Sequence, residues 1–178
     1  MNHEELISIA LDVGAQKAVV ISGESIVLSA LFRDICAANS CGMYGRCWMC
    51  PPDIGDIELL MDEVRSYAHG LLYQTIHEIE DSFDIEGMGV AAANHARVSQ
   101  RVNDALRPLL GRHRHLSCGG CRLCPRCAKM EGQPCRLPDK ALPPMEGYGI
   151  DVYQTTRPTE LKYINGQNTV TFFGIVLF

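Results

Sequence analysis

The amino-acid sequence predicts a single domain of the α/β (or α+β) sandwich class, with helices packed on a mixed sheet. Helical and strand-like patterns interleave along the 178 residues, which favours layers of helix and sheet over a helical bundle. Hairpin signals lie near both chain ends, and long cysteine-rich loops separate the elements between them. A chain of this length is long enough for one hydrophobic core and short for two. We therefore expect one domain over residues 1–178.

The first elements are a helix and a hairpin. Apolar residues recur at helical spacing over residues 3–13, and Gly14 follows where a helix would end. Residues 18–21 and 25–28 are β-rich runs, and the Ser-Gly-Glu segment between them has the composition of a tight turn. This pattern predicts two antiparallel strands joined by a short hairpin.

Two amphipathic helices and two more strands follow. Apolar stripes predict a helix over 53–68, with acidic residues at its start, and a long helix over 90–110. Between them, residues 71–79 alternate as a strand does. An Asn-Gly pair at 165–166 is a hairpin signal. The continuous apolar run that follows, 169–178, predicts a strand covered on both faces.

Composition and charge exclude several classes of protein. Apolar residues make up 47% and charged residues 21% of the chain, as in ordinary folded proteins. The formal net charge of -5 leaves no basic footprint for nucleic acid. The first residues include acids where an export signal needs positive charge, and no apolar run is long enough to cross a bilayer. We expect a cytoplasmic protein without nucleic-acid or membrane partners; its oligomeric state stays open.

The nine cysteines fall in two blocks, residues 36–52 and residues 118–136. In the cytosol they stay reduced, so metal binding is the leading explanation for their clustering. The second block spaces its first four thiols by two residues each, and such steps let successive thiolates converge on one metal cluster. The first block contains Cys36, Cys41, Cys47 and Cys50, and the second contains Cys118, Cys121, Cys124, Cys127 and Cys135.

Two kinds of metal centre suit these blocks. A pair of Cys-x2-Cys units would satisfy a structural zinc site with four thiolates. However, the second block has more thiols than one zinc uses, and the steps of four and five residues in the first block are poor zinc spacings. We therefore predict iron-sulfur clusters, with zinc as the alternative.

Other motifs carry weaker signals. Segment 87–92 fits Gly-x-Gly-x-x-Ala, but no strand leads directly into it, so we interpret its glycines as the start of a helix. His113 and His115 precede the second block, where histidines are more often structural than ligands. We expect Trp48, within the first block, to shield a metal centre from water. A solvated turn explains the carboxylate among glycines in segment 145–151 as well as a site would.

Four stretches of the chain together form a family pattern. They are the first block with its Cys-Pro-Pro ending, residues 119–136, segment 145–151 and the strand 168–174. This pattern resembles an uncharacterised family of predicted metal-binding proteins, domain of unknown function 2284, over essentially the whole chain. The resemblance implies a metal-binding domain whose ligands are Cys36, Cys41, Cys47, Cys50, Cys121, Cys124, Cys127 and Cys135. Cys118 departs from the family pattern and is a spare thiol or an alternative ligand.

The spacing and the resemblance together favour two [4Fe-4S] clusters, each held by four thiolates, in a protein that transfers electrons to a redox partner protein. The alternatives are an iron-sulfur enzyme with a labile cluster site and a zinc-stabilised interaction module. Spacing does not show whether each block holds its own cluster or the blocks exchange a ligand. No catalytic residue or substrate is indicated.

Overall fold

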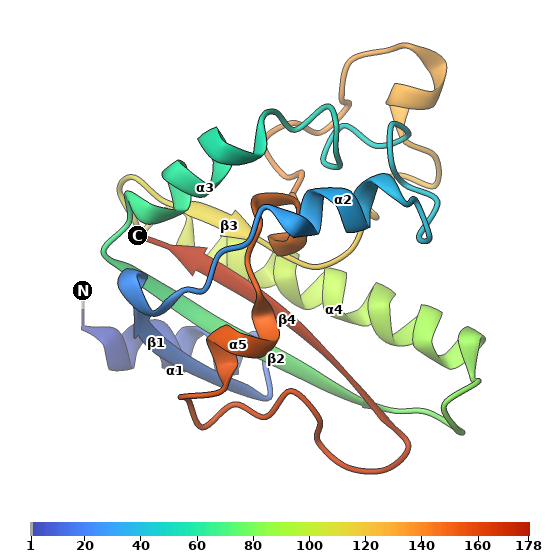
Figure 1. Ribbon diagram of the computed structural model, residues 1–178. Coiled ribbons are helices and arrows are strands. Elements are labelled where there is room, and N and C mark those ends of the chain that lie inside the picture. The colour runs from blue at the N-terminus through green and yellow to red at the C-terminus, as the bar shows by residue number, and fades with distance from the viewer. Residues whose placement is uncertain (1) are drawn as a thin grey trace.

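Four strands form one antiparallel sheet at the centre of the protein (Figure 1). A computed structural model describes residues 2–178. Its strands are β1 (Lys17–Ser22), β2 (His69–Glu78), β3 (Arg114–Leu116) and β4 (Thr169–Leu177), in the spatial order β1-β2-β4-β3. All three pairings between these strands are antiparallel. The fold is therefore α+β, and the expected mixture of parallel and antiparallel pairs is wrong.

Helices cover both faces of this sheet (Figure 1). One face packs against α1 (His3–Asp12) and α4 (Ile85–Leu106). The other packs against α3 (Ile57–Arg65), α5 (Val152–Thr156) and the 3-10 turn η3 (Met145–Tyr148). None of the helices in residues 2–178 is both long and apolar enough to cross a membrane.

The two layers divide the apolar side chains of the central strands between them. Leu71 and Tyr73 of β2 belong to the core with α1 and α4, whereas Leu72 belongs to the core on the other face. In β4, Val176 and Ile175 are divided in the same way. Successive strand residues point to opposite faces, so a strand covered on both sides needs apolar residues without alternation. The prediction of a doubly covered last strand is confirmed.

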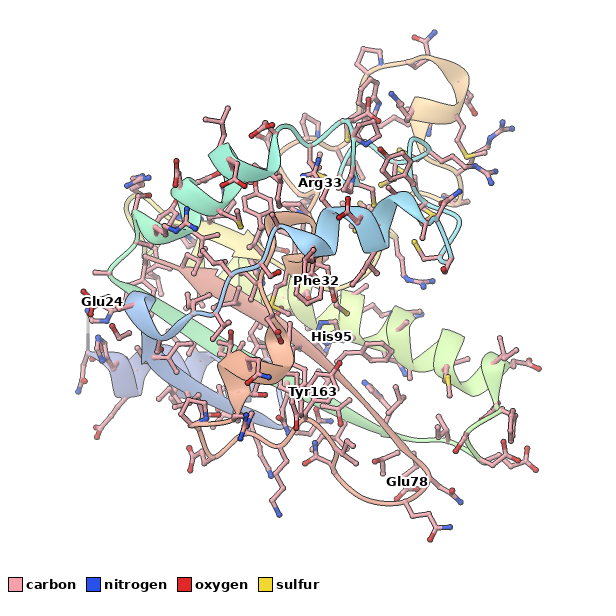
Figure 2. The ribbon with its side chains drawn as sticks, viewed as in Figure 1. Glu24, Phe32, Arg33, Glu78, His95 and Tyr163 are labelled. Atoms are coloured by element: carbon pink, nitrogen blue, oxygen red, sulfur yellow. The ribbon has the colours of Figure 1, made fainter. Side chains whose placement is uncertain are left out.

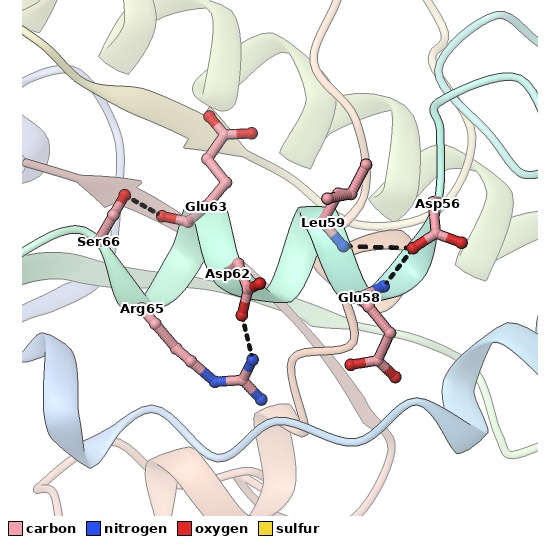
Figure 3. A network of polar contacts seen from close by, with 7 residues as sticks. All are labelled: Asp56, Glu58, Leu59, Asp62, Glu63, Arg65 and Ser66. Carbon is pink, nitrogen blue, oxygen red and sulfur yellow. Dashed lines mark hydrogen bonds and ion pairs between the residues drawn. The ribbon is translucent and has the colours of Figure 1, made fainter.

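Side-chain caps set where the helices begin. Asp56 caps α3, and its Oδ1 accepts hydrogen bonds from the N–H groups of Glu58 and Leu59 at 2.9 and 3.3 Å (Figure 3). The predicted helix from residue 53 is thus shorter, and Asp53 lies in the loop before it. In α4, Asp84 accepts from the N–H of Gly87. The glycines of segment 87–92 therefore lie in the first turns of a helix, as predicted.

The predicted hairpin near the N-terminus is wrong. After β1 the chain turns through the short 3-10 helix η1 (Gly23–Ser25), and Leu28 makes only an isolated bridge with Ile150. A Cβ on Gly23 would lie 2.1 Å from the carbonyl oxygen of Tyr67. The Gly23 N–H also donates to Ala68 at 2.8 Å. This close approach directs the chain away from β1, and β2 takes the neighbouring place in the sheet.

The Asn-Gly pair at 165–166 does not form a hairpin either. The side-chain amide of Asn165 donates to the Lys162 carbonyl at 2.8 Å and to the Thr171 hydroxyl at 3.0 Å, which closes a loop before β4. β4 then pairs with β2 and β3, which are distant in sequence. Long-range pairing of an apolar strand has prevailed over the local turn signal.

Two short α-helices and one short strand were not predicted. The helices α2 (Leu31–Ala37) and α5 have only seven and five residues, and β3 has three. Periodicity needs longer windows to be recognised. All the same, α2 and β3 matter here, because each leads into a cysteine block.

Candidate metal centre

The two cysteine blocks form loops that lie side by side at one end of the fold, where the cyan and light orange segments meet in Figure 1. The indole N–H of Trp48 donates to the Gln133 carbonyl at 2.8 Å. The ammonium of Lys129 lies 4.3 Å from the centroid of the Trp48 ring and forms an ion pair with Asp53. We call these four residues the loop latch. It ties the first block to the second and holds Trp48 beside the thiols of the second block.

Backbone hydrogen bonds shape the first loop. Asn39 has a left-handed φ of 56° and accepts from the Tyr44 N–H at 3.0 Å through its side chain. The Gly45 N–H then donates to the Pro51 carbonyl at 2.9 Å. The chain therefore folds back on itself between Asn39 and Pro51, which brings thiols at irregular spacings into one region.

Three thiols of the first block share a cavity of about 310 Å³. Phe32 of α2, labelled in Figure 2, and Glu146 of η3 form part of its wall. Of the thiols, Cys50 is buried and Cys41 is exposed. The three are Cys36, Cys41 and Cys50. We call this space the trio cavity.

The fourth thiol of the first block faces the other loop. Cys47 lines a second, much smaller cavity of about 20 Å³ between the blocks, together with Trp48. The other thiols of this cavity are Cys121, Cys124, Cys127 and Cys135. We call this space the second-block cavity. The structure thus brings all eight expected residues to two neighbouring cavities, but divides them as three and five rather than four and four.

Cys47 lies where the two cavities adjoin and is fully buried. A hydrogen bond from the Cys50 thiol lowers the pKa of Cys47, and hydrogen bonds from the N–H groups of Met49 and Cys121 and from the Cys127 thiol act in the same direction. The same Cys47–Cys50 contact raises the pKa of Cys50. Because Cys47 and Cys50 line different cavities, this contact joins the two cavities.

Cys118 lines neither the trio cavity nor the second-block cavity, but it shares one further cavity with Cys121. It lines two further cavities, of about 190 and 260 Å³, with Arg122 in the wall of both. The larger one is also lined by Glu146 and by Tyr163, which Figure 2 labels. Burial raises the pKa of the Cys118 thiol. Its role as a spare thiol or an alternative ligand therefore stays a prediction.

The two histidines before the second block do not face the thiol cavities. His115 is buried on β3, with Nε2 2.9 Å from the Tyr73 hydroxyl and Nδ1 3.4 Å from Asn103 Oδ1. His113 lies 2.8 Å from the Gly111 carbonyl. Both contacts are structural, as the sequence indicated.

The donor set suits a metal that prefers sulfur. All nine thiols are free, and eight of them border the two cavities; thiolates select zinc, copper(I) and iron-sulfur clusters. One carboxylate oxygen, Oε2 of Glu146, is shielded from solvent and lacks a hydrogen-bond partner beside the trio cavity. Within residues 2–178, no group of three or more His, Cys, Asp or Glu side chains is already set to hold a metal ion.

The fold and its paired thiol cavities define the class: a cysteine-rich α+β protein with candidate metal sites. The model of a family described as predicted metal-binding protein (DUF2284) matches residues 19–178, and the chain belongs to this family. The match includes all nine cysteines and confirms the resemblance seen in the sequence. No curated protein and no solved structure matches the chain.

Glu146 is the main site residue that the sequence did not identify. It lies 96 positions beyond Cys50 in the numbering and borders the same cavity. A carboxylate among glycines in segment 145–151 was the available signal, and a solvated turn explained it equally well. Only the three-dimensional structure shows that this turn faces thiols.

Proposed function

We propose that the protein carries two [4Fe-4S] clusters, one at each thiol cavity, and transfers electrons to a redox partner protein. The observation that carries this proposal is the meeting of eight thiols from two loops at adjoining cavities, with the Cys47–Cys50 contact between them. When bound, such clusters supply one-electron redox chemistry at potentials set by charge, hydrogen bonds and solvent exposure.

The chain itself tunes these conditions. The thiols are the ligands, and the N–H groups of Met49 and Cys121 are aimed at Cys47, where they stabilise negative charge on sulfur. Trp48 lines the second-block cavity and Phe32 lines the trio cavity, so each cavity has an aromatic ring in its wall. The loop latch holds the two loops at a fixed separation.

Of the two thiol cavities, the trio cavity is the one that we expect to face the redox partner protein. Its thiol Cys41 is exposed, and α2 beside it exposes Leu31 and Ile35, with 69% and 63% of their surface accessible. Exposed apolar side chains next to a redox centre are suited to a transient protein contact. In this proposal electrons leave the protein on that side.

Metal and sulfide analysis of anaerobically purified protein tests the proposal. About eight iron and about eight sulfide per chain, with broad visible absorption that bleaches reversibly on dithionite, are expected for two such clusters. A colourless protein with one or two zinc ions per chain would refute it.

A zinc-stabilised module is the second candidate, and one observation favours it. The second-block cavity, at about 20 Å³, has the volume of a single small ion rather than of a cluster, since a single water already needs roughly 10–15 Å³. Four thiolates from Cys-x2-Cys units suit tetrahedral zinc. The same analysis distinguishes the cases, because zinc there would give about one zinc and about four iron per chain.

A further inference from the structure

The trio cavity has one thiol fewer than a four-thiolate centre needs. Cys36, Cys41 and Cys50 line it, whereas Cys47 lines the second-block cavity, where four other thiols are already present. Cys47 accepts hydrogen bonds there from the N–H of Cys121 and from the Cys127 thiol. The second block is thus complete without Cys47, and a centre in the trio cavity lacks its fourth ligand.

Glu146 borders the trio cavity, and one of its carboxylate oxygens has no hydrogen-bond partner within residues 2–178. Its carboxylate accepts hydrogen bonds from its own N–H and from the N–H of Gly119. Oε2 is nevertheless shielded from solvent and has no hydrogen-bond partner within the described part of the chain. A buried carboxylate oxygen without a donor is costly, and native proteins keep such groups where a ligand or ion satisfies them.

A further contact fixes Glu146 relative to the thiols. Arg33, three positions before Cys36 on α2, donates to the Gly147 carbonyl at 3.2 Å and to the Gly55 carbonyl at 2.8 Å (Figure 2). A Cβ on Gly147 would lie 2.7 Å from Cδ1 of Ile54, so the η3 turn packs tightly on the first loop. The helix that carries Cys36 and the turn that carries Glu146 are therefore joined through one guanidinium.

We infer that Glu146 is the fourth ligand, through Oε2, of the metal centre held by Cys36, Cys41 and Cys50. Carboxylate oxygens bind iron and zinc in proteins alongside other ligands. This assignment rests on the proposed function, and it replaces Cys47 by Glu146 in the first ligand set. Cys47 then remains between the two centres as an acceptor of hydrogen bonds.

An oxygen ligand makes the fourth position accessible. Glu146 also lines the adjoining cavity of about 260 Å³, which contains Cys118 and Tyr163. A small molecule with an oxygen or nitrogen donor can approach the trio centre from that side, at the position where the weaker ligand binds. The three thiolates would continue to hold the centre.

Anaerobically purified Glu146→Gln and Cys47→Ser variants test the assignment, with Cys118→Ala as the matched control. Iron and sulfide content, the paramagnetic resonance spectrum of the dithionite-reduced protein and the reduction potentials are measured. Glu146→Gln removes one negative charge at unchanged shape, so the potential of one centre rises and its spectrum changes while the other centre stays the same. Cys47→Ser and Cys118→Ala keep about eight iron per chain.

The opposite pattern overturns the assignment: Cys47→Ser loses about half of the iron, and Glu146→Gln matches the wild type in spectrum and potential. If Glu146→Gln is too unstable to purify, Glu146→Cys replaces it, and a full iron content with a changed spectrum of one centre supports the assignment. An unchanged Glu146→Cys spectrum refutes it. A colourless wild type that contains zinc refutes the proposed function itself. A brown wild type whose spectrum and potentials do not change in the Glu146 variants refutes only the assignment of Glu146 as a ligand.

Discussion

The buried His95 should make the stability of the fold depend on pH in a way that one substitution removes. His95 lies on α4 in the layer between helix and sheet, with 1% of its surface exposed (Figure 2). Its Nδ1 is 2.8 Å from the Thr75 hydroxyl and its Nε2 is 3.3 Å from the Ser99 hydroxyl. Burial lowers the pKa of His95 from its ordinary value of 6.5 to about 4.

The sign and size follow from proton uptake. The unfolded chain binds a proton at His95 below about pH 6.5, and the folded chain does not until about pH 4. His95 therefore contributes its full stabilisation above pH 6.5, and this contribution is lost as the pH falls towards 4. Each proton taken up on unfolding lowers the free energy of unfolding by about 1.4 kcal/mol per pH unit. His115, whose pKa burial lowers to about 3, adds a similar slope.

Urea unfolding of wild type and His95→Gln between pH 4.5 and 7, followed by circular dichroism, measures this effect. Glutamine keeps a polar group of similar reach without the titration. We expect its plot of unfolding free energy against pH to be shallower by about 1.4 kcal/mol per unit between pH 6 and 5. At pH 7 the variant should be about 1–3 kcal/mol less stable because Thr75 or Ser99 loses a partner. The thiols contribute equally to the pH dependence of both proteins, so their contribution cancels in the comparison. Equal slopes would refute a neutral, buried His95.

Three further predictions concern the metal loops and the core. Trp48→Phe keeps an aromatic ring but loses the hydrogen bond to the Gln133 carbonyl. A chelator should therefore remove metal from the variant roughly tenfold faster than from wild type, which is the factor that about 1.4 kcal/mol represents. Equal release rates would count against the loop latch. Cys135→Ser should retain about half of the iron, whereas Cys118→Ala should retain all of it, and iron analysis that ranks them the other way contradicts the ligand sets. Leu72→Ala should destabilise the fold by about 2–5 kcal/mol in urea unfolding, because Leu72 is 1% exposed; a loss under 1 kcal/mol would show that the site collapses.

The sequence predicted elements whose pattern is long and self-contained. The helix α4 and the strand β4 have enough residues for their periods to be read, and both are present. The hairpin near the N-terminus failed because Gly23 approaches the Tyr67 carbonyl too closely for a strand to return there. That contact joins residues 44 positions apart, which no local window contains.

The candidate site also has features that the sequence predicted and features that it did not. Spacing identified both cysteine blocks, and only the family resemblance set Cys118 apart from the expected ligands. It did not show that Cys47 turns towards the second block, because the direction of a thiol depends on loop closure at Gly45 and Pro51. Nor did it place Glu146, whose position depends on the tie from Arg33 to the η3 turn. Both features arise from contacts between distant segments.

The place of β4 in the sheet sets the order in which the protein is completed. β4 lies between β2 and β3, yet it follows both cysteine loops along the chain. During synthesis the ribosome therefore releases all nine thiols while β3 still has no neighbour and the sheet is in two parts. Closure awaits a pairing of high sequence separation, which is a slow kind of step. A metal ion that binds these thiols can therefore reach them before the sheet is complete.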